Sequence, residues 1–151
     1  EQGLEGEQTV AKELEKLPDS YYAINDVIAE WKGRKAQIDH VVIGPTGVFA
    51  IETKSLGGNL RPHPDGWLQA RTLIKSPQRQ SQYGANILSK FLEHKVQAVV
   101  TLTNSRALWL GGHDPICPVI YSPQLTSYIL NQPQILQDTP ALVKRTMDLL
   151  P

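Results

Sequence analysis

Two long stretches of the chain carry the signature of a helix. Val10 and Leu14 lie four residues apart on an apolar stripe, which predicts an amphipathic helix over residues 3–17. Ser76 suits an N-cap and the proline after it suits the first helical turn. A second helix is therefore predicted to begin there and to extend to about His94.

The residues between and after these helices favour β-structure. Residues 37–43 and 48–54 are β-rich runs joined by Gly44-Pro45-Thr46-Gly47, a strong turn signal, and together they predict a β-hairpin. Further strands are expected at residues 21–29, 96–103 and 118–121, with a second hairpin around His63-Pro64-Asp65-Gly66.

The first hairpin is apolar on both of its faces near the turn. Strand alternation places Val41 and Val48 on one face and Val42 and Phe49 on the other. A hairpin of this kind has to be covered on both sides. Short helices are also expected after the Ser-Pro and Thr-Pro pairs at residues 122–123 and 139–140. The chain is therefore predicted to form one α/β domain, a mixed β-sheet with this hairpin at its centre and helices on both faces.

The length of the turn fixes which residues of the first hairpin face each other. A regular four-residue loop makes paired residue numbers sum to 91, which places Asp39 opposite Glu52 and Gln37 opposite Lys54. Because side chains alternate between faces, all four are expected on one side of the sheet. His40 is expected on the opposite side, and it is not a candidate ligand.

Two carboxylates placed opposite each other repel and need an explanation. Asp39 and Glu52 could share a proton, with one pKa raised. They could instead hold a divalent cation, since carboxylate oxygens suit Mg²⁺ or Mn²⁺. Lys54 compensates part of the charge in either case. A plain surface ladder of charged residues is the remaining interpretation of this spacing.

Glu7 is a second unusual acid. It lies three residues before Val10 and so shares the apolar stripe of the first predicted helix. A carboxylate in line with a buried face needs a partner. The alternative is that Glu7 lies in the first helical turn, where the stripe has reached solvent and the helix dipole favours an acid.

Composition places the chain among globular domains. It has 151 residues, of which 40% are hydrophobic and 20% are charged. No apolar run approaches the ~20 residues of a membrane span, so no membrane contact is expected from this segment. The single cysteine, Cys117, cannot form an internal disulfide; it is expected near the core, and a cytoplasmic location is expected. The chain starts at Glu1 rather than at methionine, which leaves open that it is a fragment of a longer protein.

The net charge of zero hides an uneven distribution. Residues 1–30 carry two Lys against eight Asp/Glu, a net charge of −6, whereas residues 31–95 carry ten Lys/Arg against four Asp/Glu, a net charge of +6. A basic central segment is what a phosphate-binding surface needs. A dispersed set of solvated charges is an equally good interpretation.

The spacing of these residues resembles a known family. The motifs are Gly3-x-x-Gly6-Glu7, the run from Gln37 to Phe49, Ile51-Glu52-x-Lys54, the later Gly57-Gly58 and Trp67, and Ser76-Pro77-x-x-Gln80. Together they resemble the nuclease-related domain (NERD) family, of the PD-(D/E)xK nuclease superfamily. The resemblance covers residues 3 to about 100. It departs from the superfamily name at one position, where Ile38 rather than proline precedes Asp39.

The resemblance implies a restriction-endonuclease-like core and a role for each motif residue. Asp39 and Glu52 would be metal ligands, with Glu7 as an additional acid, and Lys54 would lie beside the attacking water. The candidates for contacts with nucleic acid are Gln37, Gln80, Arg61, Arg71, Lys75 and Arg79. Trp67 could stack on a base, although a core position is the better expectation for a tryptophan in an apolar hairpin.

The function that follows is Mg²⁺- or Mn²⁺-dependent hydrolysis of nucleic acid, with DNA as the expected substrate. Two alternatives belong to other classes. The domain could bind nucleic acid without useful turnover, or it could be an interaction domain of a larger DNA-processing protein. Fold alone does not decide among them.

Overall fold

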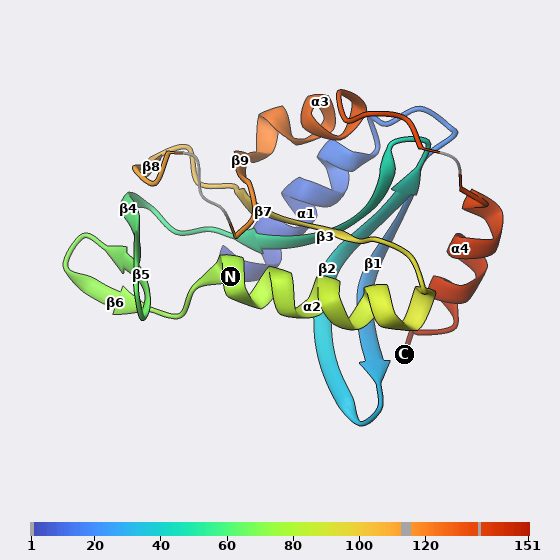
Figure 1. Ribbon diagram of the computed structural model, residues 1–151. Helices are drawn as coiled ribbons and strands as arrows, with labels where there is room; N and C mark the ends of the chain where they lie inside the picture. Colours follow the sequence, from blue (N-terminus) through green and yellow to red (C-terminus); the bar gives the residue numbers. More distant parts are fainter. Residues whose placement is uncertain (1, 113–115, 136) are drawn as a thin grey trace.

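Two β-sheets with helices packed against them make up the fold (Figure 1). The computed structural model describes residues 2–112, 116–135 and 137–151. The first sheet has the strand order β1-β2-β3-β7-β9, and its strands are β1 (Tyr22–Trp31), β2 (Arg34–Gly44), β3 (Gly47–Lys54), β7 (Gln97–Leu102) and β9 (Val119–Tyr121). Strands β1, β2 and β3 are antiparallel neighbours, whereas β7 and β9 run parallel to β3. The sheet is therefore mixed, as predicted.

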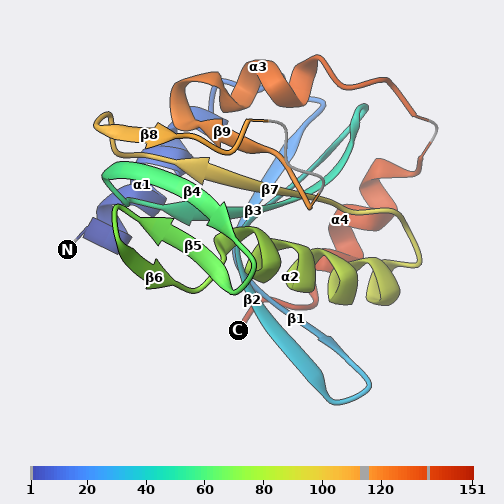
Figure 2. The same cartoon turned by 60° about the vertical axis from the view of Figure 1, so that its left-hand side comes forward.

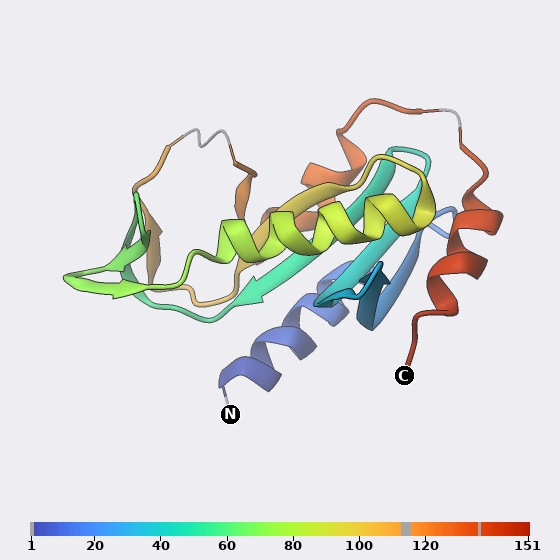
Figure 3. The ribbon, with the colours of Figure 1, turned by 60° about the horizontal axis from the view of Figure 1, so that its bottom comes forward.

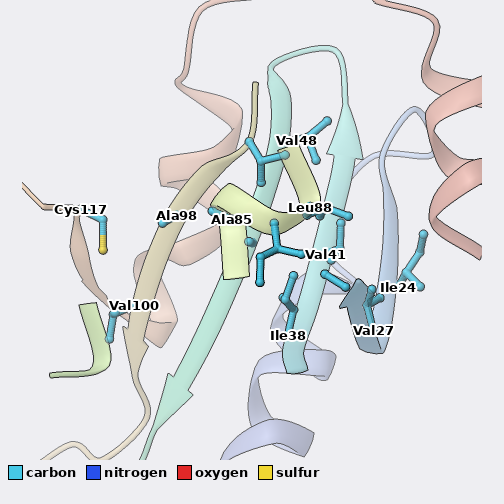
Figure 4. Packing of buried hydrophobic residues seen from close by; sticks show 14 of the residues in the cluster. Ile24, Val27, Ile38, Val41, Val48, Ala85, Leu88, Ala98, Val100 and Cys117 are labelled. Carbon is cyan, nitrogen blue, oxygen red and sulfur yellow. The ribbon is translucent and has the colours of Figure 1, made fainter. Parts of the chain in front are cut away.

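Helices cover both faces of the first sheet. On one face lie α1 (Gln2–Leu14), η1 (Ser122–Gln124) and α3 (Leu125–Leu130), and on the other lie α2 (Pro77–Leu92) and α4 (Thr139–Met147). Val42 and Phe49 are buried with α1 and α3. Val41 and Val48 are buried in a second cluster under α2, part of which Figure 4 shows. The predicted division of the hairpin into two apolar faces, each covered by helices, is confirmed.

The start of α2 follows from its sequence. Ser76 accepts a hydrogen bond from the backbone N–H of Arg79 at 3.2 Å, and proline takes the first helical position. The helix ends at Leu92, where Glu93 adopts a left-handed conformation with φ 53°. The cap fixes the first turn of α2. The helix then presents Gln80 and Tyr83 toward the place where β2 and β3 separate.

The predicted register of the central hairpin is confirmed over five residue pairs. These run from Gly44–Gly47 at the turn to His40–Ile51, and every pair sums to 91. The ladder ends there, so the predicted pairing of Asp39 with Glu52 and that of Gln37 with Lys54 are both wrong. The part of β2 that precedes His40 pairs with β1 only. Strand β3 continues to pair with β7 as far as Lys54.

A break in strand alternation explains why the ladder ends. Ile38 and Val41 lie in the same core cluster under α2, although strict alternation would separate them. The same break occurs in β1, where Asp26 has φ 58°, a left-handed value that is unusual in a strand. The β1–β2 hairpin therefore turns away from β3 at Asp39, and Figure 1 shows the two diverging. The result is a fork in the sheet.

The second sheet was not predicted as a separate unit. Its strand order is β6-β5-β4-β8, from β6 (Thr72–Ile74), β5 (Gly66–Gln69), β4 (Gly58–His63) and β8 (Ala107–Trp109) (Figure 2). The hairpin around residues 63–66 is confirmed, but it pairs with β6 and β8 rather than joining the first sheet. The sequence showed no register signal for pairing β4 with the distant β8.

Trp67 anchors this second sheet and is a core residue. It is 0% exposed, and its indole N–H donates to Oε1 of Gln78 at 2.9 Å. The amide of Gln78 donates in turn to the carbonyl of Cys117 at 2.8 Å. Cys117 is buried at the end of the main cluster (Figure 4), as expected. The idea that Trp67 stacks on a base is therefore wrong.

No helix among the described residues has the length and apolar character needed to cross a membrane.

Candidate functional site

A cleft opens at the fork, where β2 parts from β3. It has a volume of about 420 Å³ and draws side chains from both sides of the sheet. Its lining consists of Glu7 from α1, Lys35, Ala36, Gln37 and Asp39 from β2, Glu52 from β3, and Gln80 and Tyr83 from α2. The fork is what allows helices on opposite faces of the sheet to contribute to one cleft.

Asp39 lies next to the end of the β2–β3 ladder, where a backbone N–H of β3 fixes its side chain. Its Oδ2 accepts a hydrogen bond from the backbone N–H of Thr53 at 2.9 Å. In a regular ladder Thr53 would pair with Ile38. At the point where the strands separate, the Asp39 carboxylate instead accepts the Thr53 N–H, in place of a backbone carbonyl. Burial raises the pKa of Asp39, while the Thr53 N–H and the Lys54 charge partly oppose that rise.

Glu52 is the most perturbed carboxyl group of the cleft. Burial, and then the charge of Asp39, raise the pKa of Glu52 to about 7, although the ammonium of Lys54 opposes the rise. The Lys54 Nζ lies 3.4 Å from Glu52 Oε2, and the two side chains are 30% and 16% exposed. A carboxyl group with a raised pKa stabilises the folded state while it is protonated and loses that contribution as the pH rises through the raised value. The ionised acid pair is therefore unfavourable above about pH 7 unless a cation is bound.

Glu7 brings a third carboxylate to the cleft from the opposite side. Because α1 begins at Gln2, Glu7 lies in its second turn, and the alternative of a first-turn acid facing solvent is wrong. Burial raises the pKa of Glu7, with further contributions from the charges of Asp39 and Asp26. Glu7 and Asp39 line the same cleft, and the pKa of Glu7 is raised in part by the Asp39 charge.

The donor set fits a hard divalent cation. The cleft offers carboxylate oxygens, and burial, the largest cause in each case, raises the pKa of all three of its acids. Within the described ranges no group of three or more His, Cys, Asp or Glu side chains is arranged to hold a metal ion. Mg²⁺ commonly takes only one or two carboxylates and keeps several waters, which suits Asp39 and Glu52.

The other predicted site residues divide into two groups. Gln37 and Gln80 line the cleft beside the carboxylates. The four predicted cations, Arg61, Arg71, Lys75 and Arg79, do not line it; they belong to the second sheet, its connections and the first turn of α2. The guanidinium of Arg79 donates to the carbonyl of Pro64 at 2.8 Å.

His40 lies outside the cleft. It is 2% exposed, and its Nδ1 shares a hydrogen bond of 2.8 Å with the side chain of Asn25. Burial lowers the pKa of His40 to about 4, so the ring is neutral at pH 7. His40 does not line the cleft, although the charge of Asp26 acts on its ring.

Sequence reasoning missed three contributors to this region. Tyr83 and Lys35 line the cleft, and Asp26 is a fourth acid whose charge reaches Glu7 and Asp39. Asn25-Asp26 in the middle of a predicted strand was an available signal, because Asn and Asp are disfavoured in strands and tolerate left-handed backbone. For Tyr83 and Lys35 the sequence carried no such signal.

Gly6 determines how closely α1 approaches the fork. A Cβ atom at this position would lie 2.5 Å from Ser55 Oγ, closer than real Cβ atoms come, and 3.1 Å from Thr103 Oγ1, a tight contact. Those two hydroxyls are themselves hydrogen bonded at 2.7 Å. The missing side chain therefore lets α1 sit against the ends of β3 and β7, and this places the adjacent Glu7 in the cleft.

Gly6→Ala should push α1 away from β3 and destabilise the fold by roughly 1–3 kcal/mol, the usual cost of overpacking. Gly3→Ala is the matched control, because a Cβ there meets nothing within 4 Å and should be neutral or slightly stabilising. Adding Ser55→Ala to Gly6→Ala removes the nearest clash and should recover most of the loss. Urea unfolding of the four proteins measures this. Equal stability of the Gly6 and Gly3 variants would contradict the close-approach role.

Comparison with known proteins gives one family and one relative. The NERD (nuclease-related domain) family model matches residues 2–120. An uncharacterized protein of Bacillus anthracis is 47% identical over 58 residues, a match that covers 37% of this chain and 27% of that protein. No solved structure matches significantly.

The family match spans most of the chain, including α1, the fork and α2. The two mixed sheets flanked by helices are consistent with a nuclease-like core. The chain belongs to the nuclease-related domain family.

Proposed function

We propose that this domain hydrolyses phosphodiester bonds in nucleic acid, with DNA as the expected substrate, and that it uses Mg²⁺ or Mn²⁺ held by Asp39 and Glu52. The single observation that carries this proposal is the acid pair, Asp39 and Glu52, which lines a cleft open to solvent at the fork. The Lys54 ammonium does not line the cleft itself but lies 3.4 Å from the Glu52 carboxylate. A nuclease-related function is what membership of the family indicates.

The cleft residues suit the demands of phosphodiester hydrolysis. A divalent cation bound there would lower the pKa of a water molecule and neutralise charge on the phosphate oxygens. Asp39 is oriented for this by the Thr53 N–H, so little reorganisation is needed before binding. Lys54 can orient the attacking water or stabilise developing negative charge at a phosphate oxygen. Glu7 would join as a further acid from α1.

Gln37 and Gln80 are the residues proposed to contact the substrate. Each side chain lines the cleft, and each amide offers donors to a phosphate or sugar oxygen without adding charge. They come from β2 and α2, so a phosphate between them would lie next to the acid pair. The proposed role of both residues is to position the scissile group.

Binding without turnover is the second candidate function. The observation in its favour is that no three-ligand metal group is preformed among the described residues. The same cleft would then recognise nucleic acid without activating water.

A cleavage assay separates the two functions. The purified protein is incubated with supercoiled and with single-stranded DNA, in EDTA and in millimolar Mn²⁺. Cleavage is expected only with the metal. Binding of either DNA without any metal-dependent cleavage would contradict the hydrolytic proposal, and a parallel incubation with RNA tests the expected preference for DNA.

A further inference from the structure

A groove extends from the cleft along the β1–β2 hairpin. It has a volume of about 480 Å³ and lies between the turn of that hairpin and α2, which Figure 3 shows together. Its lining residues are Trp31, Lys32, Arg34, Tyr83, Asn86, Ile87 and Lys90. Tyr83 lines both the groove and the carboxylate cleft, and Lys35 of the cleft directly follows Arg34 of the groove. The two hollows therefore adjoin at Tyr83.

The groove has the charge that a phosphate backbone requires. Lys32, Arg34 and Lys90 line it, and no acid of the described part of the chain does. Lys35 lies 3.5 Å from Glu30, but the two side chains are 68% and 53% exposed, so solvent screens this pair and Lys35 stays available. The carboxylate cleft has the opposite charge. A polyanion would therefore be attracted along the groove. It would meet the acids only in the cleft, where their negative charge is needed to bind a cation.

The aromatic side chains indicate which form of nucleic acid fits. The Tyr83 side chain is 45% exposed at the junction of groove and cleft, and Trp31 lies further along with the Lys32 ammonium 5.7 Å from its ring centroid. Trp31 is partly buried against the core, so Tyr83 is the exposed ring of the two. An exposed ring in a basic groove forms a stacking platform for an unpaired base. In a duplex the base faces are already stacked, and only edges and phosphates can be contacted.

We propose that this groove binds single-stranded nucleic acid, with its phosphates on Lys32, Arg34 and Lys90 and a base stacked on Tyr83, and that it leads the strand to the acid pair. The inference rests on the proposed function for what happens at the acids, but the binding itself needs no metal. It also differs from the earlier expectation that Arg61 and Arg71 make the phosphate contacts, because those residues lie on the second sheet, away from the groove.

The test measures binding of a fluorescent oligothymidylate strand in EDTA, where no cleavage occurs. Lys32→Glu with Arg34→Glu should weaken binding at least tenfold and should flatten the dependence of log K on log salt by roughly 1.4, the value for two phosphates on a single strand. Arg61→Glu with Arg71→Glu makes the same change of charge and should alter affinity less than twofold. A duplex of the same sequence should bind the wild type more weakly than the strand does.

Stacking is tested separately at Tyr83. Tyr83→Ala should weaken strand binding by roughly fivefold to 150-fold, whereas Tyr83→Phe keeps the ring and should bind like the wild type. Melting curves verify that each variant is folded. The inference is overturned if the Arg61 and Arg71 pair matters more than the groove pair, if the duplex binds more tightly, or if Tyr83→Ala is silent.

Failure of this inference can be told apart from failure of the proposed function. Strand binding that depends on the groove, without cleavage in Mn²⁺, refutes the hydrolytic proposal and leaves the groove intact. Cleavage in Mn²⁺ by a protein whose groove variants bind normally refutes the groove and leaves hydrolysis intact.

Discussion

Lys54→Met is expected to abolish DNA cleavage while leaving most of the protein's response to divalent cations in place. The Lys54 Nζ lies 3.4 Å from Glu52 Oε2, so it is close to the acids without being a possible metal ligand. Its proposed task is to orient the water or to stabilise charge on the phosphate. Loss of one such group typically lowers the rate by roughly 10²–10⁴-fold. The measurements are the cleavage rate and the shift in melting temperature on adding Mn²⁺.

Lys144→Met is the matched control for this substitution. Lys144 is an exposed lysine on α4, and it should be dispensable for both measurements. Methionine at position 54 also removes a charge that opposes the rise in the Glu52 pKa, so tight metal binding should need a somewhat higher pH in the variant. If Lys54→Met cleaves at the wild-type rate, the lysine has no part in the chemistry.

The sequence carried most of what was needed to predict the central hairpin. The loop from Gly44 to Gly47 fixed a register that the structure follows over five pairs, and the Ser76 cap located the start of α2. These features are local, because a turn and a cap depend on residues a few positions apart. Glu7, Asp39 and Glu52 line one cleft, as the motifs led us to expect, although the register that was to pair Asp39 with Glu52 ends one residue earlier.

What could not be predicted depends on contacts between distant parts of the chain. Strict alternation failed at Asp39, because Asp26 on the neighbouring strand breaks the pleat at the same level. The pairing of β4 with β8 joins segments more than forty positions apart, and no pattern specifies it. The groove depends on how the β1–β2 hairpin leans toward α2, which is why Lys32 and Arg34 were not candidates.

The second large effect concerns metal binding by the acid pair. Asp39→Asn retains an oxygen that can accept the Thr53 N–H, but it removes the charge that raises the Glu52 pKa. In EDTA this variant should be as stable as the wild type or more stable by roughly 0.5–1 kcal/mol, because the repulsion between the Asp39 and Glu52 carboxylates is lost. With a divalent cation the order should reverse, since a ligand that binds only the folded state stabilises it by RT ln(1 + [L]/Kd).

The central claim is that Asp39 and Glu52 hold a divalent cation, and melting curves at pH 8 test it most directly. At that pH Glu52, with a pKa of about 7, is mostly ionised. At a Mn²⁺ concentration 100 times Kd, wild type should melt roughly 5–11 °C higher than in EDTA. Asp65→Asn, which removes an exposed acid from the β4–β5 turn, should respond like the wild type. Asp39→Asn should barely respond; a shift equal to that of the wild type would show that the acid pair does not bind the metal.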